Sequence, residues 1–286
     1  MGIRFGPAGN SLSFYGQGYK SSVEAPKWLA DMGLSAYEYS CTKGVKIKED
    51  TASRIGEEAY KYDIAMSIHA PYFINMASTD PRKRNNSIEY IMQSMQAARW
   101  MGAKRVVFHP GSCGKMDRRK ALILAGETLK RTIREAGERG FGDIVLCPET
   151  LGKKNQLGSL EEVVEMCGMD DRLMPAIDFG HINAYTGGGL KTSEDFAGVL
   201  DTIEQALGYE YIKNLHVHFS RIEFTKGGEK KHWTFADTQY GPEFEPFAGV
   251  LAKKRLQPVI ICESRGTMAE DALEMKEIYE GVLKTL

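Results

Sequence analysis

Short apolar runs alternate with segments of helical spacing along the whole chain, and this alternation constrains the fold more than any other feature. Continuous apolar strands that alternate with helices are typical of parallel sheets whose faces are covered by helices. The predicted strands are Ile3–Phe5, Ala36–Tyr39, Ile64–His69, Arg105–His109, Ile144–Cys147, Met174–Asp178, Ile212–Phe219 and Val259–Cys262. The predicted helices are Val23–Met32, Glu49–Lys61, Ser87–Met101, Arg118–Arg139, Leu160–Met166, Ser193–Leu207, Glu245–Lys253 and Met268–Leu283.

Eight such units in 286 residues suit a closed barrel, since a (β/α)8 barrel typically takes about 250 residues. An open doubly wound sheet is the alternative, and it would more often carry a glycine-rich phosphate turn after its first strand. Here Pro7-Ala-Gly-Asn10 follows the first strand, and the Gly187-Gly-Gly189 run lacks that fingerprint. We therefore predict an α/β fold: one (β/α)8 TIM barrel that spans residues 1–286 as a single domain.

Composition narrows the classes of protein. The 37 Lys and Arg against 38 Asp and Glu give a net charge of −1, which argues against a protein that coats nucleic acid by overall charge. The 5 cysteines never occur as Cys-x-x-Cys, so a disulfide framework or a thiolate zinc site is not expected. No stretch approaches the roughly 18 apolar residues of a membrane span, and the first residues lack a signal-peptide pattern, so we expect a cytoplasmic protein.

Residue types that bind metals stand at the ends of six consecutive predicted strands. In a (β/α)8 barrel these ends meet at one mouth, where active sites are built. Imidazoles and carboxylates that converge there suit zinc, manganese or iron, and a set this rich can hold more than one ion. The strand-end residues are His69, His109, Glu149, Asp178, His216 with His218, and Glu263; His181 and His232 fall in the following loops.

The surroundings of Glu149 and the spacing of two histidines add to the argument for a metal site. Glu149 directly follows an apolar strand without a Lys or Arg neighbour, so a bound cation would offset the cost of burying its carboxylate. His216 and His218 alternate on one strand and therefore face the same side. One of them is expected to bind metal; His216 is the choice here, with His218 as the alternative.

These residues belong to motifs that resemble the endonuclease IV family of apurinic/apyrimidinic endonucleases, a branch of the xylose isomerase-like barrels. The resemblance implies a DNA repair hydrolase that cleaves double-stranded DNA 5′ to abasic sites by means of zinc-activated water. The motifs are His69-Ala-Pro-Tyr-Phe73, Phe108-His-Pro-Gly111, Glu149-Thr150, Asp178-Phe-Gly-His181, Leu215-His216, His232 and Cys262-Glu263-Ser264.

The resemblance also implies the roles of individual residues around two or three Zn²⁺ ions, with Mn²⁺ as a substitute. His69, His109 and Glu149 would hold one ion. Glu149 would bridge to a second ion held by Asp178, His216 and Glu263. His181 and His232 would hold the third. No protein partner is implied, and we expect a monomer.

Two departures from the family pattern concern the third ion and the DNA contacts. The family has an aspartate two residues before the loop histidine, where this chain has Lys230. Either Glu229 or Asp237 could replace that aspartate, or Lys230 could itself act at the scissile phosphate, beside Glu149 and Glu263 as catalytic residues. After the second strand, Ser40-Cys-Thr-Lys43 is not the family's usual basic DNA-contacting stretch.

Side chains after the third strand are the predicted DNA contacts. Tyr72 and Phe73 match the place where the family inserts side chains into the duplex, and rim or core aromatics are the alternative interpretation. Arg82 and Arg84 lie in one of four basic clusters that follow strand ends and favour a phosphate-bearing ligand. The other clusters are Arg118-Arg-Lys120, Lys153-Lys154 and Lys226 to Lys231.

Two other functions remain open. A sugar isomerase or epimerase of the same superfamily would use one divalent ion between Glu149, Asp178, His216 and Glu263 to move a proton next to a carbonyl. A barrel that binds DNA without cleaving it is the third possibility. Metal content discriminates the first two, because phosphodiester cleavage predicts two or three zinc ions per chain and the sugar reaction predicts one manganese or magnesium ion.

Overall fold

Eight parallel strands form a closed barrel in the computed structural model, which describes residues 2–285. They pair as two four-stranded sheets, β1-β12-β9-β8 and β2-β3-β4-β6. Parallel bridges between Ala8 and Glu38 and between Glu149 and Ala176 join the two sheets, which confirms the predicted (β/α)8 fold. The barrel strands are β1 (Arg4–Pro7), β2 (Ala36–Ser40), β3 (Ala65–His69), β4 (Arg105–Phe108), β6 (Val145–Pro148), β8 (Ala176–Asp178), β9 (His216–Phe219) and β12 (Val259–Cys262).

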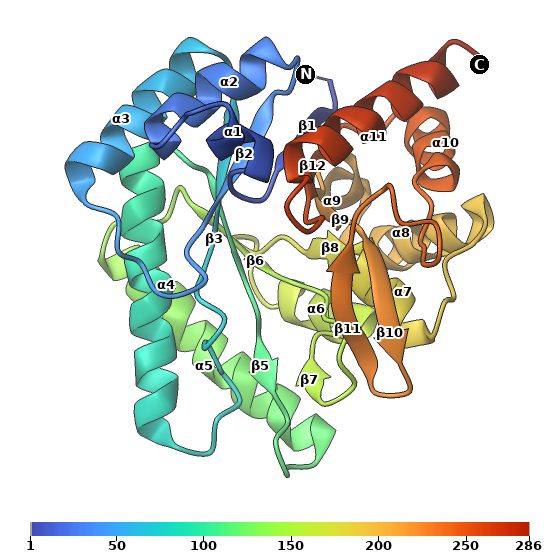
Figure 1. Ribbon diagram of the computed structural model, residues 1–286. Helices are drawn as coiled ribbons and strands as arrows, with labels where there is room; N and C mark the ends of the chain where they lie inside the picture. Colours follow the sequence, from blue (N-terminus) through green and yellow to red (C-terminus); the bar gives the residue numbers. More distant parts are fainter. Residues whose placement is uncertain (1, 286) are drawn as a thin grey trace.

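Helices surround the barrel (Figure 1). Two small antiparallel pairs are added at the strand ends: β5 (Gly111–Ser112) with β7 (Gln156–Leu157), and the hairpin of β10 (Arg221–Thr225) and β11 (Gly228–Trp233). The helices are α1 (Leu12–Gly16), the 3-10 helix η1 (Ser22–Glu24), α2 (Ala25–Asp31), α3 (Glu49–Lys61), α4 (Pro81–Met101), α5 (Arg118–Glu138), α6 (Leu160–Cys167), α7 (Phe179–Thr186), α8 (Ser193–Leu207), α9 (Tyr209–Lys213), α10 (Glu245–Lys254) and α11 (Met268–Leu283).

Local capping explains several element boundaries. Helix α4 begins after Asp80, whose carboxylate accepts a hydrogen bond from the Arg82 amide (2.9 Å), and it ends at Gly102 in the left-handed conformation. The expected helix over 23–32 is divided into η1 and α2, because Pro26 has no amide hydrogen and suits only the first turn of a helix. The expected strand over 212–219 begins only at His216, since residues 212 and 213 belong to α9 and the next two residues connect α9 to the strand.

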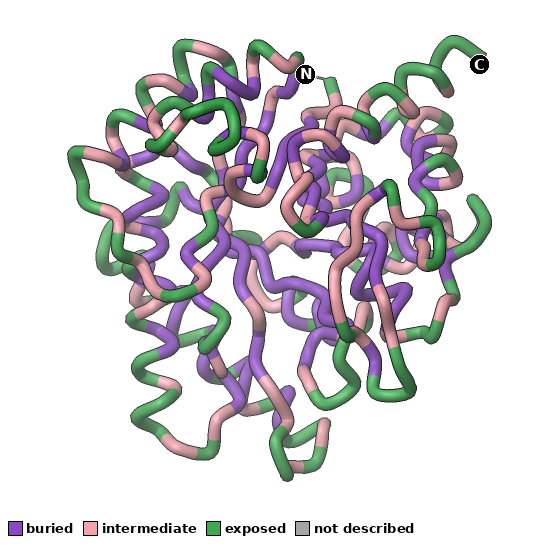
Figure 2. Tube along the Cα trace, viewed as in Figure 1, coloured by how far each residue is buried: buried purple, intermediate pink, exposed green. Residues whose placement is uncertain are grey.

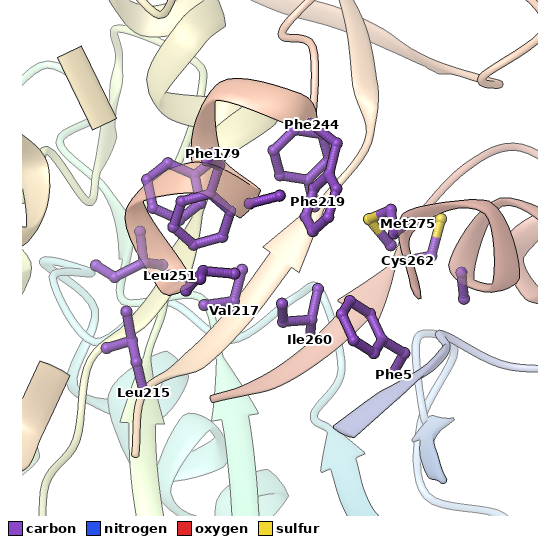
Figure 3. Packing of buried hydrophobic residues seen from close by; sticks show 14 of the residues in the cluster. Phe5, Phe179, Leu215, Val217, Phe219, Phe244, Leu251, Ile260, Cys262 and Met275 are labelled. Carbon is purple, nitrogen blue, oxygen red and sulfur yellow. The ribbon is translucent and has the colours of Figure 1, made fainter. Parts of the chain in front are cut away.

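The core lies between the barrel and its helices, and the burial pattern follows this arrangement (Figure 2). On one side, aromatic side chains fill the space between β9 and β12 and the helices α10 and α11 (Figure 3). Phe219 and Phe244 meet there edge to face, with ring centroids 5.0 Å apart. Within residues 2–285, no helix has both the length and the apolar character needed to cross a bilayer.

Candidate metal centre

Four carboxyl ends of barrel strands bring one group of ligand-type side chains together. Glu149 follows β6, Asp178 ends β8, His218 lies on β9 and Glu263 follows β12. One ligand atom from each lies within 4.8 Å of the others. Glu149, Asp178 and His218 are fully buried, so their polar groups depend on one another or on a bound cation.

Glu149 connects this group to a second one. Its Oε2 lies 3.2 Å from Nε2 of His69 at the end of β3 and 3.0 Å from Nε2 of His109 after β4. Its other oxygen, Oε1, lies 3.1 Å from Nδ1 of His218. With different histidines at its two oxygens, Glu149 would be able to serve both groups if each held an ion.

A third group lies beside the first. His181, His232 and Glu263 offer ligand atoms within 4.8 Å of one another. Nε2 of His181 is also 3.5 Å from Glu229 Oε2, and Nε2 of His232 is 3.9 Å from Glu229 Oε1. Of the two carboxylates weighed as substitutes for the family's aspartate, Glu229 therefore lies at this group. Asp237 instead accepts hydrogen bonds from the amide and the hydroxyl of Thr234 (3.0 and 2.8 Å).

A bulge in β11 explains how Glu229 reaches the cluster. Residues three apart on a regular strand face opposite sides, yet Glu229 and His232 both approach His181. The pairing shifts between Glu223 and Phe224, which face Lys231 and Glu229, so Lys230 is the extra residue. Lys230, expected within the cluster, instead pairs with Glu223 and is mostly exposed.

Two glycines allow the hairpin to approach the loop after β6. Gly228 has a φ of +97°, and a Cβ at this position would lie 2.0 Å from the carbonyl oxygen of Gly152. A Cβ on Gly152 would lie 2.7 Å from Cβ of Glu229. The amide of Glu229 donates to the Gly152 carbonyl (3.0 Å), so the backbone contact that glycine permits holds the Glu229 end of β11 beside His181.

One ring nitrogen of three of these histidines is held by a nearby oxygen atom. Nδ1 of His69 donates to the Ala70 carbonyl (2.8 Å), and Nδ1 of His181 donates to the Thr150 carbonyl (2.9 Å). Nδ1 of His232 is hydrogen-bonded to the hydroxyl of Ser220 (2.8 Å). Such contacts keep a proton on Nδ1, so that Nε2 of His69 and His181 is the nitrogen that could bind an ion after it releases its own proton.

The structure places His218, and not His216, with the carboxylates at the mouth. Both side chains face the barrel interior, but His218 pairs with Asp178 in the strand register, whereas His216 pairs with Ala176, one step deeper. Nε2 of His216 instead donates to Oε2 of Glu38 (3.0 Å) on β2. Glu38 was not expected at all, and a charged residue among the apolar and aromatic side chains of the predicted strand over 36–39 is the signal that could have indicated it.

The electrostatics of the cluster are those of a site for cations. Burial would raise the pKa of Glu149, but His218 and His109 hold it well below its usual range. Burial raises the pKa of Glu263, and the charge of Glu149 adds to this effect. Oδ2 of the buried Asp178 has no hydrogen-bond partner among residues 2–285. A carboxylate oxygen without a partner, among imidazole nitrogens, fits a divalent ion.

Asp178 has a second role in the backbone. Its Oδ1 accepts a hydrogen bond from the His181 amide (2.7 Å) and so caps α7, a helix that begins where a loop was expected. Because His181 lies in the first turn of α7, the cap fixes its position relative to Asp178. Oδ2 of Asp178 lies 3.3 Å from Nδ1 of His181.

The predicted DNA contacts lie at the mouth or near it. The side chains of Tyr72 and Phe73 are 58% and 51% exposed, and the Tyr72 ring stacks on His109 with centroids 5.4 Å apart. Arg82 is exposed in the first turn of α4, while Arg84 donates to the Ser78 carbonyl (2.6 Å). Two other cations, Arg118 and Arg119, form ion pairs with Glu162 and Glu165 and are therefore less available to a phosphate.

A pocket of about 370 Å³ opens at the mouth. Its walls include Tyr72, His232 and Glu263, so it reaches the metal-type ligands directly. Lys231 and Arg265 also line it, and neither forms an ion pair within residues 2–285. The pocket therefore combines ligand-type side chains with two cations that can face an anionic group.

Comparison with known proteins agrees with this architecture. An uncharacterized protein of Methanocaldococcus jannaschii is 31% identical over 272 residues, 95% of each chain. A probable endonuclease 4 of Mycoplasma pneumoniae is 30% identical over 161 residues, about half of each chain (54% and 53%).

Two solved structures share the fold over nearly the whole of both chains. Endonuclease IV of Thermus thermophilus superposes with a TM-score of 0.69 at 20% identity, covering 100% of this chain and 99% of the other. A D-tagatose 3-epimerase-like protein superposes with a TM-score of 0.74, also at 20% identity, covering 99% of each chain. Residues 26–280 match the family described as xylose isomerase-like TIM barrel. This chain therefore belongs to the xylose isomerase-like TIM barrel family.

Proposed function

We propose that this protein is a metal-dependent phosphodiesterase that cleaves DNA 5′ to abasic sites. The observation that carries the proposal is the sharing of ligands between groups. Glu149 belongs both to the group with His69 and His109 and to the group with Asp178, His218 and Glu263. A reaction that needs one ion uses only one of these two groups. An in-line displacement at phosphorus, in contrast, uses adjacent ions to stabilise both the attacking and the leaving oxygen.

Each group would hold one ion. His69, His109 and Glu149 would hold the first, and Glu149, Asp178, His218 and Glu263 the second. His181 and His232 would hold the third, with Glu229 in the place of the family's aspartate. Bound zinc would supply Lewis-acid chemistry, namely activation of water and neutralisation of charge on the phosphate. The borderline nitrogen and oxygen donors favour zinc, with manganese as a substitute.

Other side chains at the mouth would position the DNA. Lys231 and Arg265 line the pocket beside His232 and Glu263, where they would bind the phosphate next to the ions. Tyr72 and Phe73 would stack against bases or fill the space left by a flipped abasic nucleotide. Arg82 is placed to contact the backbone from the start of α4, whereas Lys230 is not assigned a catalytic role because it pairs with Glu223.

Incubation with duplex DNA that carries one abasic analogue tests this function. With zinc or manganese present, we expect a single nick on the 5′ side of the lesion by the wild type and none by Glu149→Gln. Undamaged duplex of the same sequence is the matched control. Absence of nicking by a wild-type protein that contains metal, or equal nicking by both proteins, would reject the proposal.

The group of Glu149, Asp178, His218 and Glu263 supports a second candidate, a sugar isomerase or epimerase with one divalent ion. Elemental analysis separates the two functions, because two or three zinc ions per chain support phosphodiester cleavage and a single ion supports the sugar reaction. A protein that binds abasic DNA in a salt-sensitive manner without cleaving it would instead indicate a binding role.

A further inference from the structure

A buried polar column lies inside the barrel, directly below the candidate metal centre. It consists of Glu38 on β2 and of His216 and His218 on β9, and none of the three is exposed to solvent. An isolated carboxylate inside a barrel costs several kcal/mol unless it is paired. The contacts of Glu38 therefore show what it is paired with.

The two oxygens of Glu38 have different partners. Oε2 accepts hydrogen bonds from the Ser67 hydroxyl (2.8 Å) and from Nε2 of His216 (3.0 Å). Oε1 lies 3.0 Å from Nε2 of His218. Within residues 2–285, neither of these two buried atoms has a partner with hydrogen-bond geometry, and their 3.0 Å approach is an ion-pair contact. Because the carboxylate oxygen can only accept and lies against Nε2, a proton on Nε2 of His218, with a small turn of the ring, would satisfy both buried atoms at once.

The opposite nitrogen of His218 faces the metal-type ligands. Nδ1 lies 3.1 Å from Oε1 of Glu149 and 3.4 Å from Oε1 of Glu263. We infer that Glu38 is a positioning residue, which holds the His218 ring and its Nε2–H tautomer so that the Nδ1 lone pair faces the cation. The inference rests on the proposed metal centre. In His69 and His181 a backbone carbonyl serves the same purpose. An anionic carboxylate makes the imidazole a stronger electron-pair donor to the cation than a carbonyl does.

The column is better suited to hydrogen bonds than to an ion of its own, although its three residues lie close enough to hold one. NH1 of Arg105 lies 3.5 Å from Nδ1 of His216, and NH2 donates to the Asn214 carbonyl (2.6 Å). A donor at Nδ1 leaves the proton of His216 on Nε2, where it is given to Glu38. A cation here would also stand close to the half-buried guanidinium of Arg105, which opposes its binding.

Zinc affinity measured by competition with a chromogenic chelator tests the inference. Glu38→Gln keeps the shape of the side chain but removes the charge and one acceptor oxygen. We expect a loss of about 10–100-fold in affinity for one ion per chain, the range typical of carboxylates that support a ligating histidine. Ser67→Ala is the matched control, because it removes a hydrogen bond to the same carboxylate at a similar depth and leaves the His218 contact in place. Its affinity should stay close to that of the wild type.

The tautomer of His218 gives a readout that a general loss of packing would not change. In ¹⁵N-histidine NMR of the zinc-loaded wild type, assigned with His218→Gln, we expect His218 to carry its proton on Nε2. A wild-type His218 that is protonated on Nδ1, or bound to metal through Nε2, overturns the inference even if Glu38→Gln fails to fold. Unchanged zinc affinity in a folded Glu38→Gln overturns it as well. A wild type that binds no zinc rejects the metal centre itself, so the two failures are distinguishable.

Discussion

Oε1 of Glu149 and Nδ1 of His218 lie 3.1 Å apart although 69 residues separate them in the sequence. Glu149 follows β6 and His218 lies on β9, with β8 between these two strands. Their approach depends on the parallel bridge between Glu149 and Ala176, which joins the two sheets. The barrel closure therefore places the central carboxylate against its histidines.

Replacement of Glu149 should have the largest effect on metal content. Glu149→Gln keeps the volume but removes a charge that faces His69, His109, His181 and His218. We expect at least two ions to bind weakly or not at all, and activity on abasic DNA to fall by at least about 100-fold, more than for an outer partner of a metal ligand. Elemental analysis after gel filtration measures the first effect. Full metal content in the variant would contradict the shared position of Glu149.

A pair of variants separates the two histidines of β9. His218→Gln should lose one ion per chain, since it removes a nitrogen that faces Glu149 and Glu263. His216→Gln should keep the full number of ions. It should, however, lower the free energy of unfolding by about 1–3 kcal/mol, because the buried Glu38 and the half-buried Arg105 each lose a partner. Metal content and denaturant unfolding of both variants provide the comparison, and the reverse pattern would restore His216 as the ligand.

Metal content and cleavage also test the positions of Glu229 and Lys230. Glu229→Gln should lower occupancy of the site formed with His181 and His232, because it removes the carboxylate that lies 3.5 Å from His181. Lys230→Ala should leave metal content and cleavage unchanged, since Lys230 pairs with Glu223 outside the cluster. Loss of cleavage in Lys230→Ala, with all ions retained, would instead support the role expected for this lysine from the sequence.

The pH dependence of the metal-free protein follows from His69. Burial alone would lower the pKa of His69, but the hydrogen bond and charge of Glu149 raise it from 6.5 to about 9. Because the folded pKa lies above the unfolded value, the protonated imidazole stabilises the fold below about pH 6.5, and this contribution is lost as the pH rises to about 9. The Tm of chelator-treated protein should therefore fall across this interval, and less so in His69→Gln.

Zinc should show the opposite trend over the same interval. His69 must release its proton before Nε2 can bind an ion, so zinc affinity should rise from pH 6.5 toward 9. Titrations in two buffers of different ionisation enthalpy would count the protons released. Proton release that does not decrease between pH 7 and pH 9 would contradict this account.

Phe73 offers a test of the DNA contacts that leaves the ligands in place. Its exposed ring packs edge-on against Tyr90 with centroids 4.7 Å apart, whereas Tyr72 stacks on His109 and is less independent of the site. Phe73→Ala should weaken binding to abasic duplex by about 5- to 100-fold if the ring stacks on a base. Tyr60→Ala is the control, because Tyr60 is 92% exposed and lines a cavity at the opposite end of the barrel. Metal content should be normal in both.

The sequence predicted the barrel because each of the eight strands is a local apolar run, and the position of metal-type residues at strand ends then follows from the fold. It could not decide between His216 and His218, since alternation places both on one face and only the register with β8 shows that His218 is level with Asp178. Glu229 was one of two alternatives, because a bulge changes which residues share a face and leaves no clear mark in the sequence.

Residue 38 contributes to the molecule twice. Its carbonyl accepts a hydrogen bond from the Gly9 amide (2.9 Å), part of the seam between β1 and β2, while its side chain supports His218. Any separation of these two strands would also pull the carboxylate away from the imidazole. On warming, zinc release should thus precede the loss of the helical circular dichroism signal. The ion would then report early that β1 and β2 separate.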